Sequence, residues 1–227
     1  MIGDSSRRSA GRSAVVCPNQ LYRIFVTNDL PPRQTLTLSQ FLIGAGLFEG
    51  ALLLVAFALG LVVDVHPTAE LDWSLQDFGI GLSATVPMLF LLVACLLSKA
   101  NGLVQIREFL REMLGPLLDR CRIIDILFLA LLAGVCEEVL FRGLLYQWIR
   151  PWNPTLAIMV CNLLFALAHS ITPLYAMLAG FIGLYLTALM TVDSTPNLLI
   201  PMTAHVAYDF VAFLVILWDY RRTVASG

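Results

Sequence analysis

The chain has 227 residues, of which 59% are hydrophobic and 13% are charged, and its formal net charge is −2. Soluble domains are about 45–50% apolar and about 25% charged, so this composition indicates a membrane protein and excludes an ordinary soluble domain. No basic cluster is dense enough to suggest nucleic acid, and we expect no nucleic-acid partner.

Residues 1–38 form the most polar part of the chain. We predict that they are a cytoplasmic, partly disordered tail, because arginines near the first span favour the cytoplasmic side. The stretch "SSRRSAG" is similar to a twin-arginine signal, but no short apolar region or cleavage site follows it directly. Residues 39–220 are predicted to be one intramembrane helical domain.

Long apolar segments follow the tail. A span needs about 20 apolar residues, and on this scale we predict about six transmembrane helices in an all-α, polytopic membrane helix bundle. The predicted spans are 40–63, 78–98, 123–149, 155–169, 173–190 and 197–218.

An amphipathic helix is predicted between the second and third spans, at "NGLVQIREFLREMLG". A helical period places one set of side chains on an apolar face and a second set on a polar face, so we expect the helix to lie flat on the membrane surface. The apolar set is Leu103, Ile106, Leu110 and Met113, and the polar set is Arg107, Glu108, Arg111 and Glu112.

The distribution of basic residues predicts the topology. The tail, the 99–122 connection and the C-terminal "YRR" are basic, and with six spans all three fall on one side; Arg150 is the exception. Basic segments stay on the cytoplasmic side, so both termini are predicted to be cytoplasmic. We expect an integral, multi-pass protein of a bacterial-type inner or plasma membrane.

Three charged residues interrupt the third span, in "AGVCEEVLFRGLL". Glu138 and Arg142 are four residues apart on a helix, in the acid-before-base order that favours a pair, and a buried pair neutralises itself. Glu137 lies on a neighbouring face and has no partner in the motif. A carboxylate without a local partner at membrane depth is a candidate functional residue.

Two later spans carry further polar groups. "CNLLFALAHS" places Asn162, Phe165 and His169 on one face, and "TAHVAYDF" places His205 and Asp209 four residues apart. Polar groups in a membrane bundle converge inward. Two carboxyl groups and two imidazoles that converge would form an acid/base constellation.

The motifs E-E-x-x-x-R, F-x-x-x-H and H-x-x-x-[N/D] occur in this order within residues 121–215, as "EEVLFR", "FALAH" and "HVAYD". In this respect the chain resembles the CAAX protease and bacteriocin-processing family of intramembrane glutamic endopeptidases, which includes the prenyl-protein (Ras-converting) protease. The resemblance implies hydrolysis of a peptide bond in a membrane-associated substrate, either CAAX-like or a leader peptide. It implies the lipid bilayer and a peptide or protein as partners, lipid-modified or membrane-anchored, and no cofactor.

The resemblance also implies roles for the residues. Glu137 would act as the general base that activates water, and His169 would hold and polarise that water. His205 and Asp209 would lie around the scissile carbonyl as electrophilic or oxyanion-stabilising groups. Asp209 stands where prenyl-protein proteases have Asn, so it would either donate to the oxyanion in its protonated form or orient His205 as the donor. The supporting residues would be Glu138 and Arg142, which brace the site, and Asn162 and Phe165, which pack beside His169.

Other chemistries fit some of the same residues. Glu137, His169 and His205 are the ligand types of a zinc site with two histidines and one carboxylate, although the chain has no H-E-x-x-H. A metal-independent reaction is the preferred interpretation. Cys136 is a less favoured nucleophile, because an apolar setting makes a thiol inert.

A non-enzymatic membrane protein is the alternative from another class: a transporter, an ion pathway or an immunity factor. Intramembrane carboxylates also mark ion pathways, and Glu49 in the first span lies outside every motif above. Gly46 and Gly50 surround it in "GLFEG", a spacing that lets helices approach closely. We therefore predict that Glu49 forms a hydrogen bond across a close helix contact.

Overall fold

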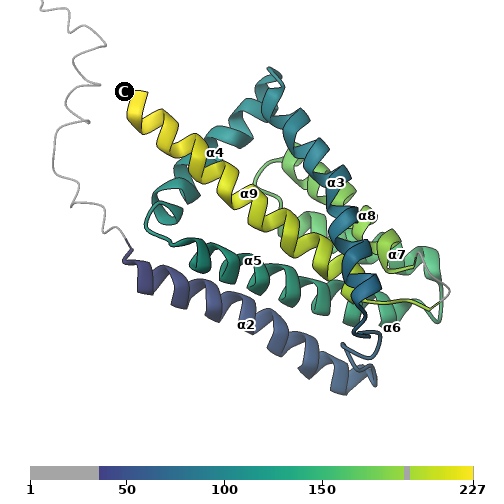
Figure 1. Cartoon of the computed structure of the whole chain (residues 1–227). Helices are drawn as coiled ribbons and strands as arrows, with labels where there is room; N and C mark the ends of the chain where they lie inside the picture. Colours follow the sequence, from purple (N-terminus) through teal and green to yellow (C-terminus); the bar gives the residue numbers. More distant parts are fainter. Residues whose placement is uncertain (1–35, 192–194, 227) are drawn as a thin grey trace, which may run out of the picture. The chain divides into compact units, whose positions relative to one another are not determined.

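The computed structural model describes residues 36–191 and 195–226, and within these ranges all regular structure is helical. The predicted all-α fold is confirmed, while the predicted tail lies outside the described residues except for its last three. The elements, shown in Figure 1, are α2 (Leu38–Val63), α3 (Leu75–Leu97), α4 (Asn101–Leu118), α5 (Ile123–Glu138), the π-helix η1 (Val139–Tyr146), α6 (Gln147–Ile149), α7 (Pro154–Ala168), α8 (Pro173–Met190) and α9 (Leu199–Ser226).

Within residues 36–191 and 195–226, four helices are long and apolar enough to cross a membrane, judged by length and composition: α2, α3, α8 and α9. The predicted span 155–169 corresponds to α7, which is apolar but has only 15 residues, fewer than the roughly 20 that a bilayer requires. The predicted span 123–149 is divided into α5, η1 and α6. The count of six spans therefore stays a prediction, whereas the integral membrane character is supported by the apolar helices.

The helices begin where the sequence supplies caps. Thr37 and Gln40 form a capping box at the start of α2, which satisfies backbone N–H groups that the first turn leaves unpaired. Asn153 and Thr172 cap α7 and α8, and each is followed by proline at the first helical position. Proline is favoured there because that position needs no N–H donor. The short Pro-containing connections thus start new helices and bring α7 back against α8.

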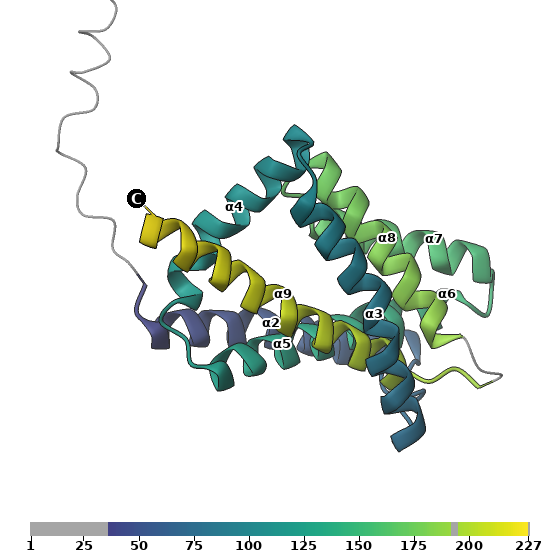
Figure 2. The ribbon, with the colours of Figure 1, turned by 45° about the horizontal axis from the view of Figure 1, so that its top comes forward.

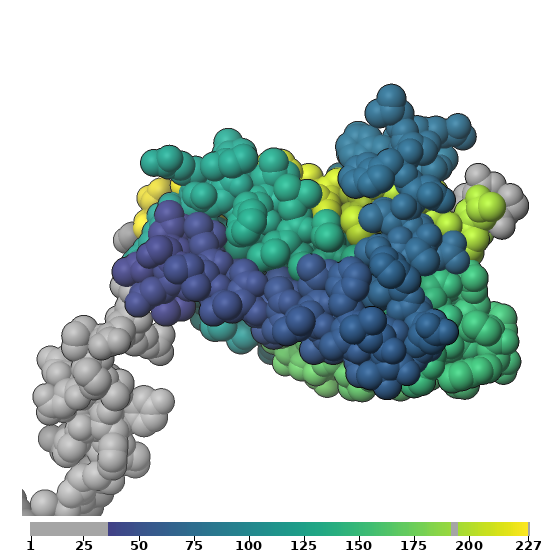
Figure 3. All heavy atoms as spheres, turned by 90° about the horizontal axis from the view of Figure 1, so that it is seen from below, coloured from purple at the N-terminus to yellow at the C-terminus, as the bar shows by residue number. Residues whose placement is uncertain are grey.

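Helix α9 is the centre of the bundle. It contacts α3, α4, α5 and α8, while α2 packs along α5 and α7 packs on α8 and η1. Figures 1 and 2 both show α9 crossing between α3, α4 and α5, and Figure 3 shows the face along which α2 lies. The outer surface carries large exposed apolar side chains, among them Leu47, Leu61, Phe90 and Phe181. Such a surface suits contact with lipid rather than water.

Helix α4 is amphipathic, but its inward face differs from the predicted one. Leu103, Ile106 and Leu110 do face the bundle, whereas Met113 is 56% exposed. The assignment of Arg107 and Arg111 to the polar face was wrong, because both line an internal pocket beside these leucines. Long guanidinium side chains can do so because they find partners there. The position of α4 at the membrane surface stays a prediction.

The predicted role of Glu49 was also wrong. A Cβ atom added at Gly46 or Gly50 would meet no atom within 4 Å, so no close helix contact exists at these positions among the described residues. The Glu49 Oε2 atom is buried and has no hydrogen-bond partner there. The small-residue spacing was misleading because it records the space that glycine leaves and not whether another helix fills it.

Candidate active site

The site begins where α5 changes into a π-helix. Glu138 is the last residue of α5, and the next eight residues, Val139–Tyr146, form η1. π-Helical turns are rare and occur frequently at functional sites. The helix widens after Glu138, within a segment that contains no proline. Nothing in the local sequence marks this position except the charged residues.

Glu138 and Arg142 form a buried ion pair, as their spacing predicted. Both side chains have no exposed surface, and the Arg142 Nη1 atom lies 2.8 Å from Glu138 Oε1. The guanidinium also donates from Nη2 to the Gly183 carbonyl oxygen at 2.7 Å and from Nε to Thr187 Oγ1 at 3.3 Å. A buried charge needs both a counter-charge and satisfied hydrogen bonds, and Arg142 has both. It connects η1 with α8.

Asn162 joins the same network from α7. Its Oδ1 atom accepts from Arg142 Nη2 at 3.4 Å, and its Nδ2 atom donates to the Ile158 carbonyl oxygen at 2.8 Å and to Thr187 Oγ1 at 3.2 Å. Sequence reasoning missed Thr187, which is the polar residue in "GLYLTALM". A single threonine in an apolar helix can bond to its own backbone, so the sequence offered only a weak signal.

Gly183 makes room for this network. A Cβ atom at this position would lie 2.7 Å from Asn162 Oδ1 and 3.2 Å from Arg142 Nη2. The absence of a side chain therefore lets the guanidinium reach the backbone of α8. Sequence reasoning missed Gly183 too, because a glycine in a membrane helix has many explanations.

Phe165 lies between the ion pair and the histidines. Its ring is 2% exposed, the Arg142 guanidinium carbon lies 4.6 Å from the ring centroid, and the His169 ring stacks on it with centroids 4.5 Å apart. The His205 ring meets its edge at 6.0 Å. An aromatic ring with a cation on its face is attracted to that cation. Phe165 thus sets the positions of Arg142, His169 and His205 at once.

His205 contacts two carboxyl groups. Its Nδ1 atom lies 2.9 Å from Glu138 Oε1, whereas its Nε2 atom lies 3.6 Å from Asp209 Oδ2. The predicted partner was Asp209, and the prediction missed the shorter contact with Glu138. A carboxylate accepts hydrogen bonds, so Nδ1 carries a proton and Nε2 faces Asp209 and the pocket. Glu138 Oε1 therefore serves both Arg142 and His205.

Glu137 and His169 face each other without a direct hydrogen bond. Glu137 Oε2 lies 3.8 Å from His169 Nε2, and this oxygen is buried without a partner among the described residues. His169 Nδ1 lies 2.9 Å from the Phe165 carbonyl oxygen. A carbonyl oxygen can only accept, so Nδ1 is the donor and the Nε2 atom of the neutral ring presents a lone pair to Glu137.

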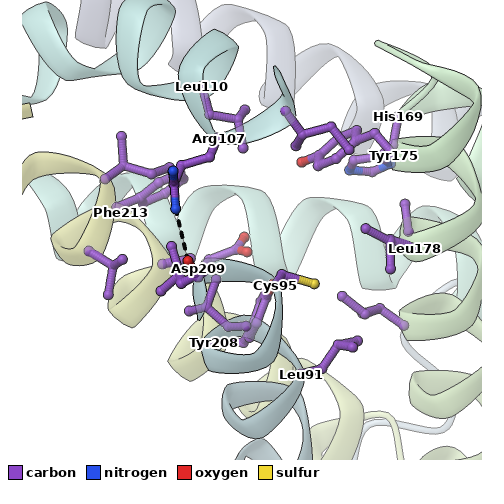
Figure 4. Close-up of a pocket in the computed structure, with 18 of the residues that line it drawn as sticks. Leu91, Cys95, Arg107, Leu110, His169, Tyr175, Leu178, Tyr208, Asp209 and Phe213 are labelled. Atoms are coloured by element: carbon purple, nitrogen blue, oxygen red, sulfur yellow. Dashed lines mark hydrogen bonds between the residues drawn. The ribbon is translucent and has the colours of Figure 1, made fainter. Parts of the chain in front are cut away.

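A pocket of about 200 Å³ opens beside these residues, enclosed by α3, α4, α7, α8 and α9. Its lining is mostly apolar and includes His169, His205 and Asp209. Figure 4 shows Asp209 and Tyr208 on α9, with His169 beside Tyr175. Glu137 lies behind this lining: its side chain is 12% exposed, and its Oε2 atom is 3.8 Å from Nε2 of His169, which does line the pocket. Sequence reasoning missed Tyr175 and Tyr208, which add hydroxyl groups to an apolar wall.

A comparison of the sequence with known protein families identifies the segment that carries this site. Residues 120–211 match the family described as "Type II CAAX prenyl endopeptidase Rce1-like", and this range holds every motif residue from Glu137 to Asp209. This segment is a CAAX protease domain. The match groups this segment, at the level of the family, with the CAAX-type endopeptidases. No curated protein and no solved structure gives a significant match to the chain.

The CAAX protease domain brings all eight predicted site residues into one region, through the contacts given above. Within the described parts of the chain, no three His, Cys, Asp or Glu side chains converge to hold a metal ion. Glu137, His169 and His205 therefore do not form a ready zinc site, and metal independence stays a prediction for experiment. Cys136 is buried, at 3% exposure, and does not line the pocket.

Proposed function

We propose that the CAAX protease domain hydrolyses a peptide bond with a water molecule activated by Glu137 and His169. One observation carries this proposal: two hydrogen-bond acceptors, Glu137 Oε2 and His169 Nε2, face each other at 3.8 Å. A water molecule about 2.8 Å from each atom fits between them and can donate one hydrogen to each. Both hydrogens of the water are then engaged, and its oxygen lone pairs are free for attack.

The reaction follows from this geometry. Glu137 accepts a proton as the water oxygen attacks the scissile carbonyl carbon, which produces a tetrahedral intermediate with a negative oxygen. His205 also lines the pocket, and a ring protonated on both nitrogens offers Nε2–H to that oxyanion while Nδ1–H stays on Glu138. Glu137 then returns its proton to the leaving nitrogen, the C–N bond breaks, and the products are a carboxylic acid and an amine.

The supporting residues hold together the helices that carry the site. Glu138 accepts from Arg142 on η1 and from His205 on α9, while Phe165 stacks on His169 from α7. Groups held in place before the reaction cost no reorganisation in the transition state. The mostly apolar pocket supports a membrane-associated peptide or protein as the substrate, either CAAX-like or a leader peptide.

The test compares variants on a mixed peptide library. The protein would be purified in detergent, and wild type, Glu137→Ala and His169→Ala would be incubated with the library with and without a strong zinc chelator. Mass spectrometry would read the products. Glu49→Gln is the matched control, since it also removes an intramembrane carboxyl group with an unpartnered oxygen, but outside the motifs.

Loss of cleavage in Glu137→Ala and His169→Ala, with retention in wild type and the control and no effect of chelator, would support the proposal. Removal of a general base costs about 10²–10⁴ in rate. Abolition of cleavage by the chelator would favour the zinc-dependent alternative. Folded protein that cleaves no peptide would favour a transporter, an ion pathway or an immunity factor.

A further inference from the structure

The pocket beside the candidate active site has a second polar region, supplied by α4. Arg107 and Arg111 both line the pocket. Arg111 Nη1 pairs with Asp219 Oδ2 at 3.5 Å, whereas no carboxylate of the described residues lies within 4.0 Å of Arg107. Arg107 therefore contributes a positive charge to this apolar pocket that the described part of the protein does not balance.

The guanidinium of Arg107 is held in one orientation. Its Nη1 atom donates to the Leu96 carbonyl oxygen at 2.8 Å, near the end of α3. Figure 4 shows the Arg107 side chain extending from α4 into the pocket. Its Nε atom is buried and has no hydrogen-bond partner among the described residues. A buried donor without a partner costs about 1–3 kcal/mol, so this position is unfavourable unless a ligand supplies an acceptor.

The orientation of Arg107 defines which ligand fits. With Nη1 engaged, the Nε–Nη2 edge remains, and this edge offers two parallel N–H groups. A carboxylate accepts both in a bidentate pair, which combines a charge interaction with a fixed geometry. The aspartates that also line the pocket, Asp209 and Asp219, favour a singly charged anion over a phosphate with a larger negative charge.

We propose that Arg107 binds the free C-terminal carboxylate of a peptide whose apolar side chains occupy the pocket. Leu103, Ile106, Leu178 and Phe213 surround the space for those side chains. This inference rests on the proposed function, because the same pocket then holds the scissile bond beside His169 and Asp209. Arg107 is a specificity-determining residue in this proposal: it selects substrates that end in a free carboxylate.

The test measures binding and cleavage separately. A fluorescently labelled peptide rich in leucine and valine would be prepared as the free acid and as the C-terminal amide. Its affinity for the detergent-purified protein would be measured by anisotropy, and cleavage in the same samples would be read by mass spectrometry. The variants are Arg107→Gln, Arg107→Lys and the control Arg120→Gln, which removes an arginine outside the pocket.

Wild type and Arg120→Gln should bind the acid about tenfold or more tightly than the amide, as expected for a charge-assisted pair. Arg107→Gln should bind both forms equally, and Arg107→Lys should retain part of the preference. A merely structural role of Arg107 would weaken both forms together and leave their ratio unchanged. Equal affinities in wild type, or no saturable binding of the acid, would overturn the inference.

The two proposals can fail independently in this experiment. Selective binding of the acid without cleavage would contradict the proposed function and leave the carboxylate site intact. Cleavage of acid and amide at equal rates, with equal affinities, would contradict the role of Arg107 and leave the proposed function intact. Displacement of the acid from wild type by phosphatidylglycerol added to the detergent micelles, without displacement from Arg107→Gln, would assign Arg107 to lipid headgroups, and would also overturn the inference.

Discussion

Replacement of Gly183 by alanine tests the packing around the buried ion pair. The new methyl group would lie 2.7 Å from Asn162 Oδ1, 3.1 Å from Phe165 Cδ1 and 3.2 Å from Arg142 Nη2. These atoms cannot easily retreat. Asn162 is tied to Ile158 by a 2.8 Å hydrogen bond, and Arg142 is tied to Glu138 at 2.8 Å. The methyl group can be accommodated only if at least one of these contacts is broken or lengthened.

Opposing effects decide the size of the change. Alanine in a helix is favoured over glycine by about 1 kcal/mol. Overpacking of a tight interior costs about 1–3 kcal/mol, and loss of a hydrogen bond to a charged group costs about 1.5–3 kcal/mol. The net expectation is a destabilisation of about 1.5–5 kcal/mol, and cleavage should fall as well because Arg142 and Phe165 support the site.

Thermal unfolding in detergent, followed by circular dichroism, would measure the effect. Gly46→Ala is the matched control, since its methyl group meets no atom within 4 Å. This control should unfold at the wild-type temperature or slightly above, because only the helix propensity changes. If Gly183→Ala unfolds at the same temperature as Gly46→Ala, the proposed close packing of Arg142 against α8 is refuted.

Three other outcomes test the site. Glu138→Gln should lower the unfolding temperature and abolish cleavage, because loss of a buried counter-charge costs about 3–5 kcal/mol and Glu138 also holds His205; wild-type thermal stability would contradict this. Arg142→Lys should keep the positive charge but lose the several N–H donors of the guanidinium, so its unfolding temperature should lie between those of wild type and Glu138→Gln. A stability equal to wild type would count against the network with Gly183. Glu49→Gln should unfold at the wild-type temperature or higher, since the amide is cheaper to bury than an unpartnered carboxyl group, so a marked drop would show that Glu49 has a partner.

Local spacing predicted the parts of this structure that depend on residues close in sequence. The apolar segments predicted the helices, because a helix with an apolar surface needs only its own composition. The four-residue spacing likewise predicted the pair of Glu138 and Arg142, whose atoms meet at 2.8 Å. The order of the three motifs predicted the family, which the match to residues 120–211 confirms.

Contacts between distant residues were less accessible to sequence reasoning. The contact of Glu138 with His205 joins residues 67 positions apart, and that of Arg142 with Thr187 joins residues 45 positions apart. No helical period encodes such pairs. The inward direction of Arg107 was missed for a related reason, since amphipathic patterns assign arginine to water unless a distant carbonyl group, here that of Leu96, accepts its hydrogen bond.

The shared oxygen of Glu138 has a consequence for biosynthesis. Oε1 accepts one hydrogen bond from Arg142, which is translated soon after it, and one from His205 in α9. Ribosomes complete α5, η1, α7 and α8 before α9 emerges, so a nascent chain that lacks α9 has Glu137 and His169 but not His205 or Asp209. On the proposed mechanism such a chain is proteolytically silent, and cleavage requires that the last helix of the described bundle has docked.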